Sequence, residues 1–196
     1  MARDEGPVAD GTEGWDAEAV RARLDALARL DPDLTRFGSE VHRYRLARPL
    51  SEAGIRAFEE RYAVRLPASY RDFLARVGGS GAGPDYGLLP LDGPLAPDSD
   101  DAVDDLQEQD RRPGFLATPF PLSAEWRREP AGRFDEEAEQ ARVAGSLVIA
   151  ESGCGEFVRL VVTGPCAGQV WFDDMTWGRI VPGPGFRAWY LAWLAK

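Results

Sequence analysis

The feature that most limits how this chain can fold is its aromatic C-terminus, with the sequence FRAWYLAWLAK over residues 186–196. Its large apolar side chains repeat at helical spacings of three and four, and they are Phe186, Trp189, Tyr190, Trp193 and Leu194. A helix with so wide an aromatic face is stable only when that face is buried against other elements. The rest of the chain must therefore supply a core that receives this helix.

Three further helices are expected before residue 80, each marked by an apolar stripe and by start or stop signals. Asp16 and Ser51 stand where N-caps belong, and Pro67 lies in the first turn of the third helix, where its missing N–H costs nothing. We expect Gly78 and Gly79 to end that helix in the left-handed conformation. The stripes are Val20, Leu24, Leu27 and Leu30, then Ile55, Phe58 and Tyr62, then Tyr70, Phe73, Leu74 and Val77.

Short runs rich in β-branched and other apolar residues, bounded by glycine, proline or aspartate, indicate strands. They cover residues 41–46, 86–91, 147–150, 157–163, 169–173 and, as an edge strand, 178–181. Helices first and mostly sequential strands after them favour an α+β fold over alternating βαβ units. We therefore expect an antiparallel sheet of about four to six strands, covered by N-terminal helices and a C-terminal amphipathic helix.

The length of 196 residues favours one domain with appendages. Residues 1–14 have few large apolar side chains and are expected to be a flexible tail. The single domain then covers residues 15–196 and carries an acidic insertion around residues 92–112. Residues 113–140 are expected to be irregular, with about one helical turn.

The charge balance excludes some partners and favours others. There are 33 acidic and 23 basic residues, which gives a net charge of −10. Such a chain repels nucleic-acid phosphates, whereas complementary charge speeds the approach of a basic protein. We expect no nucleic acid as a partner. Because the chain has no long apolar run and does not open with an apolar leader, we also expect no membrane association and a cytoplasmic location.

The densest negative charge lies in DSDDAVDDLQEQD, residues 98–110, with seven carboxylates among thirteen residues. Like charges at this density repel, so an exposed loop or a ragged helix is expected. The segment lacks the glycine that an EF-hand loop requires, and we expect no metal and no cofactor. The remaining interpretation of the charge is a docking surface for a basic partner.

Catalytic chemistry has little support in the sequence. Cys154 lies between Gly153 and Gly155, and the only histidine, His42, lies in a predicted strand far away along the chain. The two glycines stand one position from the cysteine, whereas the nucleophile elbow G-x-S-x-G places them two positions away. We interpret Cys154 as a turn residue. It and Cys166 are expected to be free thiols, because the predicted strand between them holds the two sulfurs far apart.

Three separated stretches carry a family resemblance, namely LSEAGIRAFEERYAVRLPASYRDFLARVGG at 50–79, YGLLPL at 86–91 and GCGEFVRLVVTGPCAGQVWFDD at 153–174. Through them the chain resembles the SUKH superfamily, in the branch of the yeast Smi and Knr cell-wall-synthesis regulators, over roughly residues 45–196. The resemblance implies an α+β fold. It also implies that bacterial members bind and neutralise a cognate toxin domain, often a nuclease, while fungal members are regulatory hubs. It supplies no catalytic residue.

These observations lead to one expected function with an alternative. We expect a non-catalytic protein-binding module, an immunity protein whose partner is a basic toxin domain. The alternative is a cytosolic regulator or adaptor of the same fold with no toxin partner. Carboxylates would steer the partner and aromatic side chains would anchor it. The candidate contact residues are Asp98, Asp100, Asp101, Asp104, Asp105 and Glu108, with Tyr86, Trp126 and Trp177.

Overall fold

The structure is a computed structural model that describes residues 14–92, 101–129 and 135–196. Its centre is a five-stranded antiparallel sheet in the order β1-β5-β4-β3-β2. The strands are β1 (Trp126–Arg127), β2 (Ser146–Gly153), β3 (Glu156–Val161), β4 (Gln169–Asp174) and β5 (Arg179–Gly185). The helices are α1 (Ala17–Leu30), α2 (Ser39–His42), α3 (Glu52–Tyr62), α4 (Ala68–Arg76), α5 (Asp101–Asp110), α6 (Glu136–Arg142) and α7 (Phe186–Leu194).

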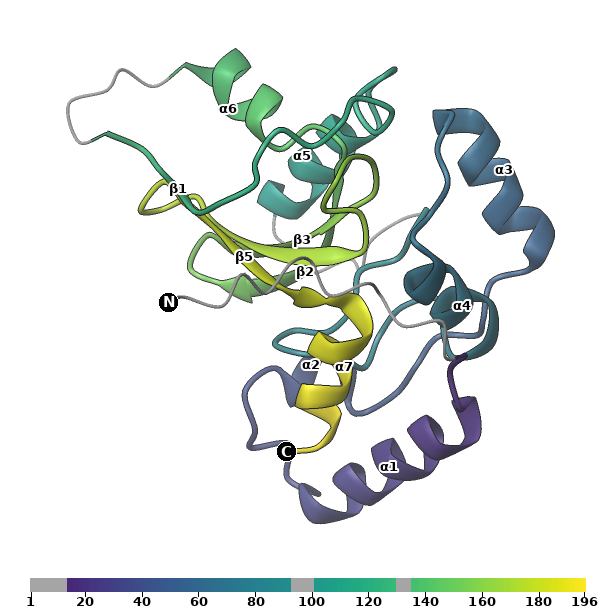
Figure 1. The fold of residues 1–196 in the computed structure, drawn as a ribbon. Helices are drawn as coiled ribbons and strands as arrows, with labels where there is room; N and C mark the ends of the chain where they lie inside the picture. The colour runs from purple at the N-terminus through teal and green to yellow at the C-terminus, as the bar shows by residue number, and fades with distance from the viewer. Residues whose placement is uncertain (1–13, 93–100, 130–134) are drawn as a thin grey trace, which may run out of the picture.

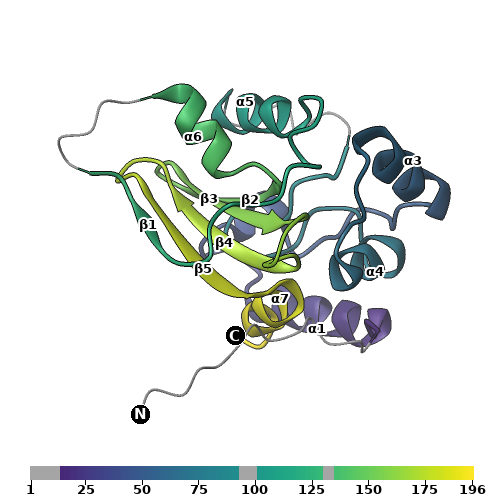
Figure 2. The ribbon, with the colours of Figure 1, turned by 45° about the horizontal axis from the view of Figure 1, so that its top comes forward.

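Helices cover both faces of the sheet. Figures 1 and 2 show α5 and α6 on one face, and α1, α4 and α7 on the other. The α7 face holds the main core, which includes Leu147, Val158, Leu160 and Val170 from the sheet. The predicted α+β class, with an antiparallel sheet, N-terminal helices and a C-terminal helix, is confirmed.

The aromatic C-terminal helix is buried as its spacing requires. Phe186 and Tyr190 are fully buried, and Trp189 and Leu194 nearly so. Trp15 lies at the centre of this cluster, with its ring edge-on to Phe73 at 5.1 Å and to Tyr190 at 5.6 Å between ring centroids. Such edge-to-face contacts add specificity to the area that the rings bury. α7 therefore joins the N-terminal helices to the sheet.

The N-terminal caps are confirmed, with one error in the apolar stripes. Asp16 accepts a hydrogen bond from the Ala19 N–H at 2.9 Å, and Ser51 accepts one from the Gly54 N–H at 3.1 Å. Leu30, predicted to belong to the apolar stripe of the first helix, is 67% exposed. It is the last residue of α1.

The two glycines after α4 do not form the predicted helix cap but allow a close backbone approach. Neither Gly78 nor Gly79 has a positive φ, so the expected left-handed cap is wrong. A Cβ on Gly78 would lie 2.9 Å from Leu46 Cβ, and one on Gly79 would lie 3.0 Å from the Arg48 carbonyl oxygen. Glycine is needed here because the backbone passes so close to residues 46–50.

Three predicted strands need correction. Residues 41–46 are not a strand, because α2 ends at His42 and Arg43 and Tyr44 take positive φ values of 47° and 57°. The segment 86–91 forms only isolated bridges at Leu88, with Gly87 at φ 97° beside it. Of the predicted edge strand 178–181, residues 179–181 belong to β5, which is an inner strand. β1, inside the segment predicted to be irregular, pairs with β5 and forms the edge.

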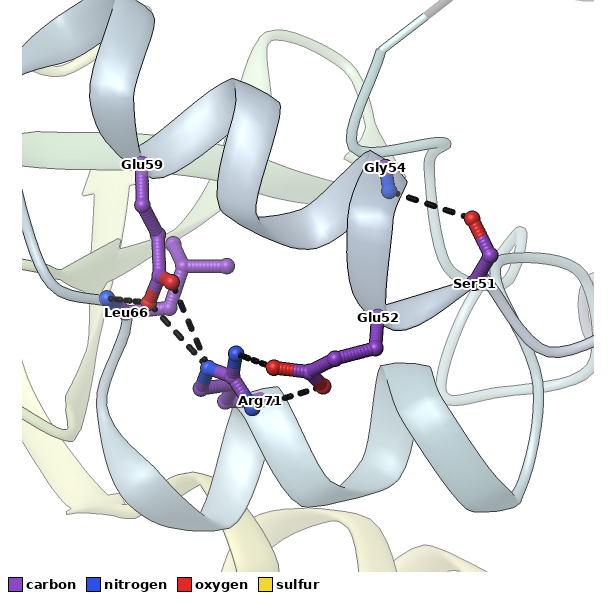
Figure 3. A network of polar contacts seen from close by, with 6 residues as sticks. All are labelled: Ser51, Glu52, Gly54, Glu59, Leu66 and Arg71. Carbon is purple, nitrogen blue, oxygen red and sulfur yellow. Dashed lines mark hydrogen bonds and ion pairs between the residues drawn. The ribbon is translucent and has the colours of Figure 1, made fainter.

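A carboxylate–guanidinium cluster joins α3 to α4 (Figure 3). Glu59, buried on α3, accepts hydrogen bonds from the Leu66 N–H at 3.0 Å and from Arg71 Nε at 3.2 Å. The same guanidinium pairs with Glu52, whose side chain is 56% exposed. The two carboxylates thus share one cation, but only Glu59 is removed from water.

We expect Glu59→Ala to lower the free energy of unfolding by about 2 kcal/mol, because it leaves the Leu66 N–H without its acceptor in the core. Glu52→Ala is the matched control and should cost less than about 0.5 kcal/mol, since exposed ion pairs contribute little. Urea unfolding of both variants measures the difference. Equal losses would contradict the distinction between the two carboxylates.

None of the helices in the described ranges has the length and apolar character needed to cross a membrane.

Candidate functional site

The acidic insertion contains a regular helix, which corrects the expected loop or ragged helix. Val103 and Leu106 of α5 are buried against Val148 and Phe157 of the sheet. The opposite side of α5 exposes three of the candidate carboxylates, Asp104, Asp105 and Glu108. The apolar spacing overcomes the like-charge repulsion because the helix packs its inner side on the sheet. Asp98 and Asp100 lie outside the described residues, and Asp101 begins the helix.

A buried charge cluster fixes the end of α5 to the sheet. Asp110 is fully buried, and its Oδ1 lies 3.0 Å from Arg159 Nη1 while its Oδ2 accepts the Val148 N–H at 2.7 Å. Arg159 Nε in turn donates to Asp173 Oδ2 at 2.7 Å. None of these three residues was predicted to have a role. The helix is therefore held by charge-assisted hydrogen bonds as well as by apolar packing.

Burial and charge oppose each other in this cluster. Burial raises the pKa of Asp110 above its ordinary value, although Arg159 and the Val148 N–H offset part of the rise. Burial lowers the pKa of Arg159, but the carboxylates of Asp110 and Asp173 outweigh it, so the pKa is raised. Arg159 is therefore a permanent cation between two buried carboxyl groups.

A cleft of about 270 Å³ lies between α5, α6 and the sheet at β4 and β5. Its apolar lining is Leu106, Trp126, Val143, Met175 and Ile180. Carboxyl groups also line it, and two of these, on Glu139 and Asp173, pair with Arg128 and Arg159. The other three carboxyl groups of the lining are those of Asp105, Glu136 and Asp174. Within the ranges that the structure describes, these three have no ionic partner.

The three candidate aromatic residues lie in different settings. Trp177 is 81% exposed in the turn between β4 and β5, and its N–H donates to Asp174 Oδ1 at 2.9 Å. Trp126 is half-buried in the cleft wall with the Arg142 guanidinium 3.6 Å from its ring centre. Tyr86 is half-buried, contacts Phe37 with the two rings tilted, and does not line the cleft. The structure thus places Trp126 in one cleft with Asp105 and Leu106 of α5, whereas neither Trp177 nor Tyr86 lines that cleft.

Cys154 lies at the tip of the hairpin between β2 and β3. Cys154 and Gly155 have φ values of 54° and 79°, which is the pattern of a two-residue type I′ turn. The thiol is exposed and free, as is the half-buried thiol of Cys166, which confirms the expected free thiols. His42 lies instead in α2, where burial lowers its pKa and its ring contacts Trp193. Across the described parts of the chain, no group of three side chains could hold a metal ion.

We expect Cys154→Asn to raise the free energy of unfolding by about 0.5 kcal/mol, because asparagine tolerates the left-handed conformation better than cysteine does. Cys154→Val should instead lower it by about 1 kcal/mol, since a β-branched residue is strained at positive φ. Urea unfolding under reducing conditions measures both changes. A loss of stability in the asparagine variant would contradict the turn assignment.

The described parts form an α+β domain that places a charged helix and a small cleft on one face of an antiparallel sheet. A family model described as SMI1 / KNR4 family (SUKH-1) matches residues 49–190, so the chain belongs to this family, which is known for immunity proteins of polymorphic toxin systems. Neither the curated proteins nor the solved structures give a match to the chain. The match covers α3 to most of α7, whereas α1 and α2 precede it.

Proposed function

We propose that this protein is a non-catalytic protein-binding module of the cytoplasm, an immunity protein that binds and neutralises a basic toxin domain. One observation carries the proposal. α5 exposes Asp104, Asp105 and Glu108 while Asp110 and Arg159 anchor its far end in the core. The negatively charged surface is therefore preformed, and the partner does not bear the entropic cost of ordering it.

The charge pattern supports a basic partner. The net charge of −10 and the exposed side of α5 both attract a cationic surface, which raises the rate of association and selects against acidic proteins. Trp177 is a large exposed side chain in the turn after β4, and Met175 of the same turn lines the cleft together with Asp105. In a toxin that acts on phosphate-containing substrates, the carboxylates of α5 would occupy the cationic cleft that otherwise binds phosphates. Inhibition by direct blockade follows from this arrangement.

Affinity capture of the full chain from its native cell, followed by co-expression with each captured protein, tests the proposal. We expect one captured protein to stop growth when expressed alone, and this chain to restore growth. The gene for that protein should lie directly upstream and encode a large secreted protein with a variable C-terminal domain. Capture of a non-toxic regulatory protein whose activity changes on binding would contradict the immunity role and would support the role of an adaptor.

A further inference from the structure

We infer that the cleft between α5, α6 and the sheet receives a lysine or arginine side chain from the protein partner. This inference rests on the proposed function, because it names the chemistry by which the same face recognises its partner. It concerns the recess between α5, α6 and the sheet, which shares Asp105 with the exposed side of α5, and three features of the recess support it.

The first feature is size. The volume of about 270 Å³ lies just below the range of about 300–1,000 Å³ that is usual for pockets of drug-sized ligands. One long side chain suits such a space better than a cofactor or a nucleotide. The lining of the cleft comes from α5, α6 and strands of the sheet.

The second feature is the arrangement of apolar and charged groups. Leu106, Trp126 and Ile180 provide apolar surface for the methylene stem of the incoming side chain. Asp105 and Asp174 lie on the lining without a paired cation in the described ranges, and their charges complement a cationic head group. Glu136 also lacks a cation there and accepts only the Gln140 side-chain amide, at 3.0 Å. Lysine and arginine are the side chains that combine a long apolar stem with a positive charge.

The third feature is that two side chains of the cleft lining, Trp126 and Glu139, already contact arginine side chains of this chain. Arg142 stacks over Trp126 at 3.6 Å and its Nη1 lies 2.7 Å from Glu139 Oε2. Arg128 Nε lies 3.2 Å from the other oxygen of Glu139. Trp126 and Glu139 together thus bind one guanidinium group within the chain, and Glu139 pairs with a second, so these lining side chains are compatible with a bound guanidinium.

The surroundings favour a side chain of a protein over a free polyamine. Met175 is 47% exposed and Trp177 is 81% exposed in the turn that borders the cleft. Large exposed apolar side chains beside a charged recess are typical of protein interfaces, in which an anchor residue enters a pocket and its neighbours exclude water. A small polyamine would leave both side chains exposed to water.

An NMR titration tests the inference with the ¹⁵N-labelled full chain at low salt. The probes are a short peptide of alternating arginine and alanine, the same peptide with glutamine in place of arginine, and spermidine. We expect the arginine peptide to shift the amide signals of Leu106, Met175 and Ile180, and the glutamine peptide to leave them unchanged. Shifts centred on α1 or α3, or equal binding of spermidine and the arginine peptide, would overturn the assignment.

Matched variants complete the test. Neutralising the cleft by Asp105→Asn, Glu136→Gln and Asp174→Asn should weaken binding of the arginine peptide about tenfold, the sum of three modest charge contacts. The control variant neutralises the same number of exposed carboxylates elsewhere, by Glu18→Gln, Asp25→Asn and Glu60→Gln, and should change binding less than about twofold. Equal weakening in the two variants would show that net charge alone explains the effect, and it would contradict the assignment of the cleft as the binding site.

The inference and the proposed function fail in different ways. If the protein rescues growth from its toxin and the cleft variant binds that toxin as tightly as the unchanged chain, the cleft assignment is wrong and the immunity role stands. If the peptide binds in the cleft and no captured protein is toxic, the cleft assignment stands and the immunity role is wrong.

Discussion

Replacing Arg159 with methionine is expected to lower the free energy of unfolding by about 3–5 kcal/mol, because it leaves two buried carboxyl groups without their cation. The side chains of Asp110 and Asp173 are 0% and 9% exposed, so water cannot take over the role of the guanidinium. In a domain of this size, such a loss lowers the melting temperature by about 10 °C. Urea and thermal unfolding measure both values.

The control for this variant is Arg179→Met. Arg179 Nε also pairs with a carboxylate, Glu125 at 3.0 Å, but its side chain is 41% exposed. We expect a loss below about 1 kcal/mol, because exposed ion pairs contribute little. Adding Asp110→Asn and Asp173→Asn to the Arg159 variant should restore part of the lost stability. If Arg159→Met costs no more than Arg179→Met, the buried cluster does not anchor α5.

Reversing the exposed charge of α5 by Asp104→Lys, Asp105→Lys and Glu108→Lys is expected to weaken the complex with the captured toxin about 100-fold at low salt. Each lysine would face the cationic surface of the partner, and like charges brought together in an interface cost several kcal/mol in total. Because Asp98 and Asp100 lie outside the described residues, the variant uses only side chains with a known exposure. Isothermal titration calorimetry measures the affinity.

The matched control carries the same change in net charge on α1 and α3, by Glu18→Lys, Asp25→Lys and Glu60→Lys. It should weaken the complex by less than about tenfold, through the long-range field alone. The difference between the two variants should persist at physiological salt. An unchanged affinity of the α5 variant at low salt would contradict an interface on this face.

Local patterns predicted the parts of the fold that depend on local physics. The apolar spacing of Phe186 to Leu194 predicted a buried helix, and the caps at Asp16 and Ser51 followed from their side chains and positions. The order of helices and strands predicted the α+β class. These features could be predicted from the sequence because each depends on residues that lie close together along the chain.

Features that depend on distant partners were missed. β1 is a strand only because it pairs with β5, more than fifty residues later, and nothing in Trp126–Arg127 indicates it. The strand predicted over residues 41–46 is absent, because α2 extends to His42 and the next two residues, Arg43 and Tyr44, adopt left-handed conformations. Residues of these types seldom take that conformation.

The sequence contained one sign of the buried charge cluster that fixes the end of α5 to the sheet. Arg159 lies in the run FVRLVV, where both of its neighbours along the predicted strand are apolar. A buried arginine requires a carboxylate partner, so this position predicts at least one buried acid elsewhere. The sequence could not indicate that the partners are Asp110 and Asp173, because 49 and 14 residues separate them from Arg159. The cleft depends on the same long-range placement of α5, so it could not be predicted from the sequence either.

The most direct test of the central claim is amide hydrogen exchange of the full chain, free and in complex with its captured partner. We predict that binding slows exchange in residues 103–108 of α5 and in the turn at residues 175–178, while α1 and α3 exchange at unchanged rates. Slowed exchange confined to α1, α3 and α4, with α5 and the turn unchanged, would contradict binding through the acidic face.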